Sequence, residues 1–579
     1  MLAKIICTTI LIEKSPQALP LGAACVASAI KNSPLTRDLC TVYLCPFCQE
    51  DSEYIKHAST QDQAAEWMAQ QLILKSQGDG SPGAGVAGQR GQGQSVELGV
   101  SNATEPYHGD GPLIVAFSVF VWNRLVLEKT ARILRQQGVI CIAGGPEVTA
   151  NPKSFTDFDY VTTMEGELRV PYLISKILSV DKEALREENL QLSLSPLSCP
   201  LDQLSSPYLD GTLDPAEYDG ALWELARGCP FKCSYCYESK GEKVVRKFPM
   251  ERIEKELDLF ARKKIGQVFV LDPTYNANKE RAVQLVNLIA KKTPDTFYYF
   301  EARAEFIDRQ MAKAFTKIPC ALQIGLQSAN EEVLKLVNRP FNRKQFVKNI
   351  GFLNEAGVTF GFDLIYGLPG ETFKSFKEGI DFALSLYPNN LEIFCLSVLP
   401  GTDLFDHAKD LHLNYMDKPP YHIINTDKFS NQDIQHASHL AQACNVFYND
   451  GRAVPWFNII THHLHIKAPE FFDRFYNEVL AKNISQSVIP VPFVRTQSEI
   501  EKLQQDFVTK LCKEKKMDRY IKVMTDLIRY YGAVSRKTDT GKTQTVQLNY
   551  PEEYLCSEYI FDLDFFTKNV KINPCSIRI

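Results

Sequence analysis

The sequence predicts an α/β protein: a doubly wound (Rossmann-like) N-terminal domain, a partial (β/α)6 TIM-like barrel and a mainly helical C-terminal domain. Short apolar runs alternate with helical stretches twice along the chain, as parallel sheets covered by helices require. Beyond about residue 410 the strand-like runs give way to helical patterns. The 579 residues, 45% of them hydrophobic, suffice for several domains with packed cores.

The first alternation, over residues 1–180, predicts the doubly wound domain. In such a sheet the ligand site lies beyond the carboxyl ends of the strands. The expected strands are Lys4–Ile10, Leu39–Cys45, Leu113–Val119, Val139–Ala143 and Tyr160–Thr163, and the expected helices are Leu21–Lys31, Gln61–Lys75 and Asn123–Gln137.

Two polar segments interrupt and follow this domain. Residues 76–111 hold ten of the 31 glycines and predict a disordered insertion, because they can bury little apolar surface. Residues 181–220 are rich in Ser, Leu, Pro and Asp without a sustained period, which is typical of an interdomain linker.

The second alternation, over residues 221–410, predicts the barrel. A helical stretch follows each expected strand, and six such units fit an open barrel better than a closed eight-unit one. The expected strands are Leu222–Ala226, Gln267–Leu271, Tyr298–Ala302, Ala321–Leu326, Thr359–Ile365 and Leu391–Val398.

Residues 411–579 predict the mainly helical domain. Helices are expected at Asn431–Phe447, Glu470–Leu480 and Thr496–Leu511. A Thr-rich, more β-like tail is expected after them, ending at residues 559–564.

Charge and hydropathy argue against two classes of partner. The 64 Lys and Arg against 69 Asp and Glu give a formal charge of −5, unlike a chain that binds nucleic acid through bulk charge. The longest apolar run, Leu113–Trp122, is far shorter than the about 20 residues that a membrane-spanning helix needs. No signal peptide is evident, so we expect a cytoplasmic protein whose 16 cysteines are metal ligands or reduced thiols.

The sharpest functional pattern is a loop of three cysteines, Cys229, Cys233 and Cys236, just after the first expected barrel strand. Its C-x3-C-x2-C spacing lets three thiolates reach one metal centre. They suit a 4Fe–4S cluster with one open iron, which leaves a site for a chelating ligand. The alternatives are zinc, which needs a fourth ligand from farther along the chain, and three buried thiols without a metal.

This loop resembles the signature of the radical S-adenosylmethionine (radical SAM) superfamily, in which an aromatic residue precedes the third cysteine, as Tyr235 does here. The resemblance implies that the three cysteines hold the cluster and that SAM chelates its open iron. One electron, supplied by an external donor such as a flavodoxin or ferredoxin, then cleaves SAM.

Later segments agree with this resemblance, each at the end of an expected strand. Phe300–Arg303 ends the third strand, Ile324–Ser328 the fourth and Phe362–Thr372 the fifth. Glycines in the last segment let backbone approach a ligand closely. The residues that the family pattern implies for SAM are Tyr235, Glu301, Arg303, Gln327, Ser328 and Gly367.

The N-terminal domain resembles the cobalamin-binding module of the cobalamin-dependent radical SAM subclass. Matching segments open its first helix and follow its third, fourth and fifth strands, where Met164-Glu-Gly-Glu167 replaces the usual Gly-Glu-Gly-Glu. No Asp-x-His-x-x-Gly segment is present and neither His57 nor His108 fits, so we expect cobalamin without a His ligand on cobalt. The residues implied for cobalamin are Leu21, Gly22, Ser118, Gly144, Gly145 and Glu165.

A second cysteine pattern lies in the N-terminal domain. Cys40, Cys45 and Cys48 have the spacing of the first three ligands of plant-type ferredoxins. An auxiliary cluster is one interpretation, and ordinary buried thiols are the favoured one.

The C-terminal domain resembles an uncharacterised extension found behind some proteins of this architecture. It would cap the barrel mouth and shape the substrate pocket. His422, Tyr448 and Arg452 are candidates to reach that pocket, although packing or surface roles are favoured for each.

Together these patterns predict a radical SAM enzyme, in first place a cobalamin-dependent methyltransferase acting on an unactivated carbon. One SAM would supply the methyl group through cobalamin, and a second would generate the radical that activates the carbon. Two alternatives stay open. One is a radical SAM enzyme with a vestigial cobalamin domain, catalysing rearrangement, oxidation or C–S bond formation; the other is a non-catalytic iron–sulfur or zinc scaffold.

Overall fold

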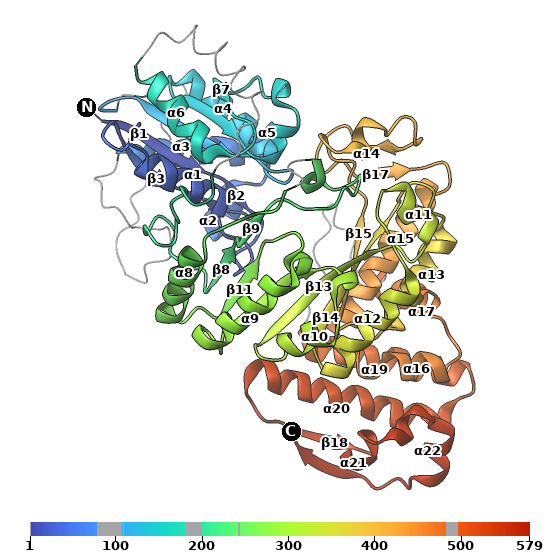
Figure 1. The fold of residues 1–579 in the computed structure, drawn as a ribbon. Coiled ribbons are helices and arrows are strands. Elements are labelled where there is room, and N and C mark those ends of the chain that lie inside the picture. Colours follow the sequence, from blue (N-terminus) through green and yellow to red (C-terminus); the bar gives the residue numbers. More distant parts are fainter. Residues whose placement is uncertain (1, 78–106, 108, 180–199, 241–243, 482–495) are drawn as a thin grey trace.

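The computed structural model describes residues 2–77, 107, 109–179, 200–240, 244–481 and 496–579. It confirms the mixed α/β class, with two parallel sheets followed by a helical region (Figure 1). Most of the expected insertion over residues 76–111 and about half of the expected linker over 181–220 lie outside the described residues.

The N-terminal sheet has five parallel strands in the order β3-β1-β5-β6-β7, and helices cover both of its faces. Helices α1 and α6 share one core with the sheet, and α3 and α4 share the other. This is the doubly wound arrangement that the sequence predicts. The bounds are β1 Ala3–Thr8, α1 Leu21–Asn32, β3 Cys40–Leu44, α2 Ser52–His57, α3 Gln61–Gln77, β5 Leu113–Ser118, α4 Arg124–Gln136, β6 Ile140–Gly144, α5 Pro146–Ala150, β7 Tyr160–Val161 and α6 Gly166–Ile177, with a short pair β2 Ile10–Leu11 and β4 Phe47–Cys48.

The second sheet has six parallel strands in the order β8-β11-β12-β13-β14-β15, which is an open barrel of six units. Strand β13 alternates buried and half-buried residues, because one face packs on helices and the other faces the barrel interior. The bounds are β8 Gly220–Trp223, α8 Met250–Lys263, β11 Gln267–Val270, α9 Lys279–Lys292, β12 Phe297–Ala302, α10 Arg309–Phe315, β13 Cys320–Gln327, α11 Glu331–Leu336, α12 Arg343–Ala356, β14 Thr359–Tyr366, α13 Phe373–Leu384, β15 Asn390–Cys395 and α14 Asp403–Asp406, with a small hairpin of β9 Ala226–Arg227 and β10 Arg246–Lys247.

The helical region packs against the last barrel strand, and the two share one hydrophobic core. Asn449 lies in a π-helical turn after α15 and covers the open edge of β15. Its side chain accepts a hydrogen bond from Leu391 N–H at 2.9 Å and donates one to Leu391 O at 3.0 Å. These bonds satisfy backbone groups that an edge strand would otherwise leave unpaired.

Beyond α15, the expected β-like tail is largely wrong. Residues 521–540 form the 20-residue helix α20 (Ile521–Thr540), because Val523, Leu527 and Tyr530 recur at helical spacing and are buried. The Thr-rich stretch ends this helix and runs into a strand at Thr545–Leu548, which pairs with Cys575–Arg578 in an antiparallel sheet. Residues 559–564 are helical in part. The bounds are β16 Asn414–Tyr415, β17 Ile423–Asn425, α15 Asn431–Cys444, α16 Phe457–His463, α17 Ala468–Phe475, α19 Gln497–Glu514, β18 Thr545–Leu548, α21 Glu552–Leu555, α22 Leu563–Asn569 and β19 Cys575–Arg578.

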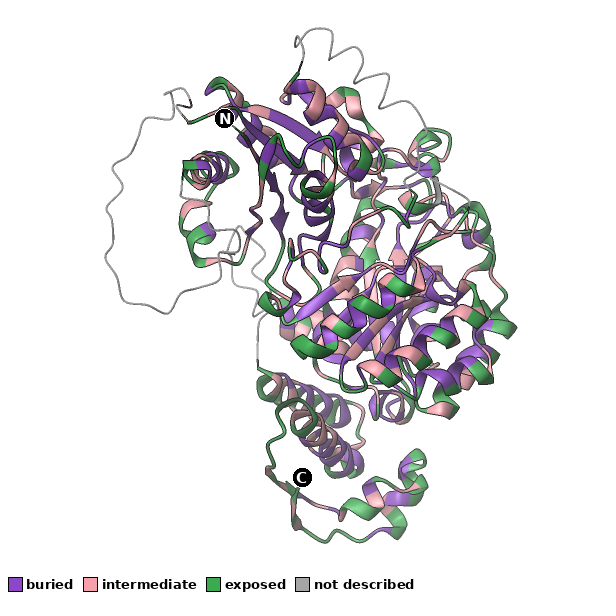
Figure 2. Ribbon diagram, turned by 60° about the vertical axis from the view of Figure 1, so that its left-hand side comes forward, coloured by how far each residue is buried: buried purple, intermediate pink, exposed green. Residues whose placement is uncertain are grey.

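Burial follows these layers: the strands are mostly buried, and the outward sides of the helices are exposed (Figure 2). The N-terminal sheet and the antiparallel pair of β18 and β19 lie at opposite ends of the molecule (Figure 1). In the part of the chain that the structure describes, no helix combines the length and apolar character needed to cross a bilayer.

Candidate functional site at the facing ends of the two sheets

The cysteine loop leaves the first barrel strand and is held by backbone hydrogen bonds. Cys236 N–H donates to Cys233 O at 3.0 Å, which closes a turn within the loop. Ser234 N–H donates to Val337 O at 3.0 Å, and Ser234 O accepts from Leu404 N–H at 2.8 Å. The loop is therefore tied to segments that follow the fourth and sixth barrel strands.

The three thiols are neighbours in the loop. Burial, helped by electrostatic repulsion from Cys233 and Cys229, raises the pKa of Cys236 to about 11. Cys229 Sγ also lies 3.8 Å from Thr274 Oγ1. Within the described ranges, no group of three or more His, Cys, Asp or Glu side chains is close enough to hold a metal ion.

Two of the residues expected near SAM come from β12 and its end. The guanidinium of Arg303 stacks on the ring of Phe231 in the cysteine loop at 3.7 Å and bonds Glu305 at 2.6 Å. Burial, and secondarily the charge of Asp363, raises the pKa of Glu301 to about 7. Arg303 is thus in contact with the cysteine loop, whereas Glu301 lies deeper in the barrel.

Gln327 ends β13 in the left-handed backbone region, with φ at 68°, and its Oε1 is buried without a hydrogen-bond partner among the described residues. Beside it lies Arg339, which sequence analysis missed. Arg339 Nη1 approaches Cys233 Sγ at 3.8 Å, and Nη2 donates to Gly325 O. A buried guanidinium and an unpaired amide oxygen therefore stand together next to the cysteine loop.

Ser328 and Gly367 contribute differently from what the sequence suggests. Ser328 Oγ donates to Glu371 Oε1 at 2.8 Å, so this hydroxyl already has a protein acceptor. Gly367 has φ at 85°, and a Cβ there would lie 2.6 Å from Ile423 Cγ2. The glycine therefore allows the C-terminal region to approach the end of β14. Tyr235 is largely buried, and burial raises its pKa.

The residues that the sequence predicts for cobalamin gather at the carboxyl ends of β5 and β6, which we call the corrin face. Ser118 and Gly144 pair in register, and Val119 N–H donates to Gly144 O at 2.8 Å. Gly145 has φ at 108°, and a Cβ there would lie 2.6 Å from Val119 O. The hydroxyl of Thr162 is buried without a hydrogen-bond partner in the described structure. A bare glycine edge with an orphaned hydroxyl fits the close approach of a flat macrocycle.

The other expected cobalamin residues border this face. Leu21 is the first residue of α1, and a Cβ on Gly22 would lie 3.8 Å from the ring of Phe120. Glu165 faces two guanidinium groups, Arg227 at 3.1 Å and Arg246 at 2.6 Å. Glu165 therefore anchors its loop through ion pairs.

Arg227 joins the two sheets. Besides Glu165, its guanidinium bonds Glu167 at 2.7 Å and Glu224 at 2.9 Å. Glu165 and Glu167 follow the last strand of the N-terminal sheet, while Arg227 is two residues before Cys229. The corrin face and the cysteine loop are consequently linked by one buried ion-pair network.

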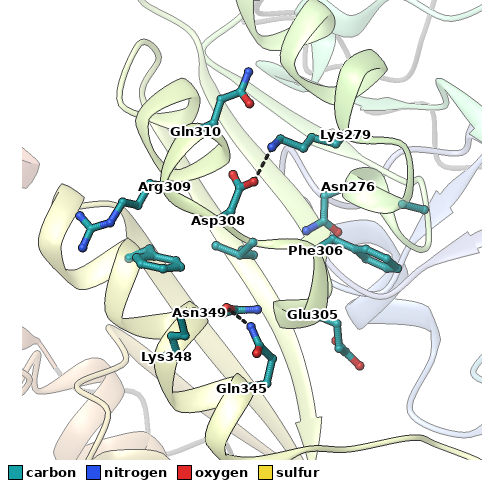
Figure 3. A pocket seen from close by; sticks show the side chains of 13 residues that line it. Asn276, Lys279, Glu305, Phe306, Asp308, Arg309, Gln310, Gln345, Lys348 and Asn349 are labelled. Atoms are coloured by element: carbon teal, nitrogen blue, oxygen red, sulfur yellow. Dashed lines mark hydrogen bonds and ion pairs between the residues drawn. The ribbon is translucent and has the colours of Figure 1, made fainter.

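A cavity of about 590 Å³ lies beside the ends of β11 and β12 (Figure 3). It is lined by α12, by the start of α10 and by the segments that follow β11 and β12, and Lys279 pairs with Asp308 in this lining. None of the expected cofactor residues lines it. It adjoins the candidate site, because Glu305 in its lining pairs with Arg303 at 2.6 Å.

The auxiliary-cluster pattern and two C-terminal candidates stand apart from this site. Burial raises the pKa of Cys40 and Cys45 to about 11 each, which favours neutral thiols. Tyr448 OH donates to Pro388 O at 2.6 Å, just before β15 and so at the amino end of the barrel strands. Arg452 pairs with Asp539 of α20 at 2.5 Å.

Comparisons with known proteins agree with this geometry. Residues 223–383 match the family described as the radical SAM superfamily, so the chain contains a radical SAM domain. Proteins described as cobalamin-dependent radical SAM enzymes are among those similar to it. Residues 409–530 match a family described as a protein of unknown function (DUF4080).

Two curated relatives are methyltransferases. The cobalamin-dependent radical SAM methyltransferase TokK of Streptomyces tokunonensis is 27% identical over 335 residues, covering 51% of this chain and 48% of TokK. The 2-(S-pantetheinyl)-carbapenam-3-carboxylate methyltransferase of Streptantibioticus cattleyicolor is 25% identical, with the same shares of each chain. The chain thus spans about half the length of these relatives.

Two solved structures share the fold. The cobalamin-dependent S-adenosylmethionine radical enzyme OxsB, with aqua-cobalamin bound, matches at a TM-score of 0.54 and 13% identity, over 98% of this chain and 85% of OxsB. The radical S-adenosylmethionine methyltransferase TsrM of Kitasatospora setae, with cobalamin and a [4Fe–4S] cluster bound, matches at a TM-score of 0.50 and 12% identity, over 76% and 82%.

Proposed function

We propose that this protein is a cobalamin-dependent radical SAM methyltransferase that acts on an unactivated carbon. The observation that carries the proposal is the link through Arg227, which joins the loop after the N-terminal sheet to the segment that leads into Cys229. A methyl group carried on one cofactor must meet a carbon activated at the other, so the two sites must face each other.

In this proposal Cys229, Cys233 and Cys236 hold a 4Fe–4S cluster, which supplies a single electron to SAM when it is reduced. The spacing of the three cysteines and the electrostatic influence of Cys233 and Cys229 on Cys236 support this role. An external flavodoxin or ferredoxin would deliver the electron. Arg303 would orient the loop through its stacking on Phe231.

SAM would lie at the ends of β12 to β14. Arg339 offers a forked guanidinium for the SAM carboxylate, and the unpaired Gln327 Oε1 accepts a hydrogen bond from its amino group or ribose. Burial of these groups excludes water, which strengthens both contacts. Glu301 would then face the substrate side of the barrel interior.

Cobalamin would rest on the glycine edge at Gly144 and Gly145, bordered by Ser118, Leu21 and Gly22. When bound, it supplies a carrier for the methyl group. His57 stacks on Trp67 of α3, with ring centroids 5.8 Å apart, which supports binding without a histidine on cobalt. His108 lies outside the described residues.

Anaerobic reconstitution tests the proposal. We expect four irons per chain, a cluster spectrum that SAM perturbs, and retention of hydroxocobalamin through gel filtration. The Cys233→Ala variant should lose the cluster and all SAM turnover, whereas Cys556→Ser, which changes an exposed thiol, should keep both. Loss of cobalamin with intact SAM cleavage would favour the alternative of a vestigial corrin domain. A reconstituted protein without iron would contradict both the proposed function and this alternative.

A further inference from the structure

The region of unknown function reaches back to the N-terminal sheet through one loop. Strands β16 and β17 form a hairpin, and the chain between them carries Tyr421. Val398 N–H donates to Tyr421 O at 2.9 Å, and Ile423 N–H donates to Leu396 O at 2.9 Å. The loop over residues 414–425 is thereby fixed to the segment that follows β15.

At its tip, Tyr421 enters a polar cluster of the N-terminal sheet. Its hydroxyl donates to Glu147 Oε2 at 2.8 Å and accepts from Arg124 Nη1 at 3.0 Å. Arg124 also bonds Glu147 at 3.2 Å. Tyr421 and Glu147 are 3% and 5% exposed, so the three groups form a network shielded from water.

Glu147 lies next to the corrin face, so a link to it can fix the position of that face. It lies in the first turn of α5, immediately after Gly144 and Gly145. The other side of this helix is also covered: a Cβ on Gly401 would lie 3.0 Å from both Ala150 and the ring of Tyr237. Tyr237 directly follows Cys236, so α5 lies between the C-terminal region and the cysteine loop.

We propose that the C-terminal region is a clamp, in which residues 414–425 hold the glycine edge of the N-terminal sheet against the barrel mouth. Tyr421 is then a positioning residue for methyl transfer: it acts through Glu147 and touches no reacting group. This inference rests on the proposed function. It assigns a role to the region that matches a family of unknown function. A clamp is needed because methyl transfer depends on sub-ångström placement of two sites on separate sheets.

The test uses two buried tyrosines that each lose only a hydroxyl. Tyr421→Phe removes the link to Glu147, while Tyr448→Phe removes a comparable bond to Pro388 O that involves no N-terminal residue. Hydrogen exchange of peptides covering residues 144–150 reports the clamp without any cofactor. The reconstituted full-length protein, supplied with SAM, hydroxocobalamin and a strong chemical reductant such as titanium(III) citrate, then reports two products: S-adenosylhomocysteine for methyl transfer from SAM and 5′-deoxyadenosine for reductive SAM cleavage in the barrel.

We expect Tyr421→Phe to speed exchange over residues 144–150 by about tenfold, because a buried hydrogen bond to a carboxylate is lost. S-adenosylhomocysteine formation should fall by about tenfold, with 5′-deoxyadenosine formation unchanged. Tyr448→Phe should change neither exchange at this loop nor the product ratio. A merely structural role would lower both products together.

Exchange in Tyr421→Phe that equals the wild type would overturn the clamp. So would equal loss of both products, or the same response in Tyr448→Phe. If the wild type forms no S-adenosylhomocysteine with hydroxocobalamin, the proposed function fails instead, and the exchange measurement still decides whether the C-terminal loop fixes α5.

Discussion

Arg227 donates a hydrogen bond of 3.1 Å to Glu165, although the two residues stand 62 positions apart, Glu165 in the loop before α6 and Arg227 in β9. Their side chains are 15% and 17% exposed. Removing one partner of an ion pair this shielded costs more than removing one partner of a surface pair, because the remaining charges are left poorly solvated. The junction between the sheets is therefore electrostatic as well as apolar.

Removing this guanidinium should destabilise the protein more than removing a surface one. We expect Arg227→Met to lower the free energy of unfolding by about 3 kcal/mol at pH 7.5, because Glu165, Glu167 and Glu224 lose their shared cation. Urea titration followed by circular dichroism measures the change. Adding Glu167→Gln should recover part of the loss, since it removes one uncompensated carboxylate.

Arg474→Met is the matched control for this substitution. Arg474 also bonds two carboxylates, Glu478 at 2.8 Å and Glu514 at 2.5 Å, but it is more exposed and lies within the C-terminal region. It should cost only about 1 kcal/mol. Equal losses in the two variants would show that the junction contributes no more than an ordinary surface network.

Much of the fold could be predicted because its signals are local. The sequence predicts each strand of the two large sheets within a few residues of its position, since buried parallel strands are short apolar runs bounded by turns. The prediction for the tail is wrong for the opposite reason. The helix α20 is stabilised by burial of one face, part of it against α19, and such tertiary contacts have no local signal in the sequence.

The residues of the candidate site also divide into those that short motifs predict and those that only the fold brings together. The cysteine loop, Gln327 and the glycine edge carry their signal in short motifs, so they could be found from the sequence. Arg339 could not be found from the sequence, because it lies 106 positions after Cys233 and reaches the thiol only in the folded protein. Tyr421 was overlooked in favour of its neighbour His422, since nothing local marks a partner 274 positions away.

Arg339 provides the second prediction. Arg339→Lys keeps the positive charge but loses the planar fork that fits a carboxylate. We expect the Kd for SAM to rise by at least about tenfold while the iron content stays unchanged. Equilibrium dialysis of the reconstituted protein measures the Kd, and a colorimetric iron assay measures the iron content. Arg343→Lys, at the start of α12, should leave the affinity as it is; an unaltered Kd in Arg339→Lys would remove this residue from the SAM site.

Glu371 should make stability depend on pH. Burial raises its pKa to about 8, and Oε2 has no partner among the described residues, so the carboxyl is protonated at neutral pH. Because the folded-state pKa lies above the unfolded value, its contribution to stability is full below about pH 4.5 and is lost as the pH rises through 8.

Glu371→Gln removes this titration while it keeps the shape of the side chain. From pH 6 to 8 the wild type should lose about 2 kcal/mol more unfolding free energy than the variant, at about 1.4 kcal/mol per pH unit below the folded pKa. Chemical unfolding at several pH values measures the difference. Parallel pH profiles would mean that Glu371 is ionised throughout, contrary to its burial.

The glycine edge gives the last prediction, through two glycines that both have a positive φ but lie in different surroundings; Gly145, with ψ at −179°, is also in a backbone region that essentially only glycine adopts. Gly145 and Gly138 have φ at 108° and 85°, but a Cβ on Gly145 would lie 2.6 Å from Val119 O, while nothing lies within 4 Å of one on Gly138. Gly138→Ala should therefore cost about 1 kcal/mol, the strain of a left-handed alanine alone. Gly145→Ala should cost at least about 3 kcal/mol, because β5 and β6 must also separate at their carboxyl ends.

If that edge carries the corrin, the reconstituted Gly145→Ala protein should lose hydroxocobalamin on gel filtration while it keeps its iron, and Gly138→Ala should keep both. Full cobalamin retention in Gly145→Ala would place the corrin elsewhere on the molecule.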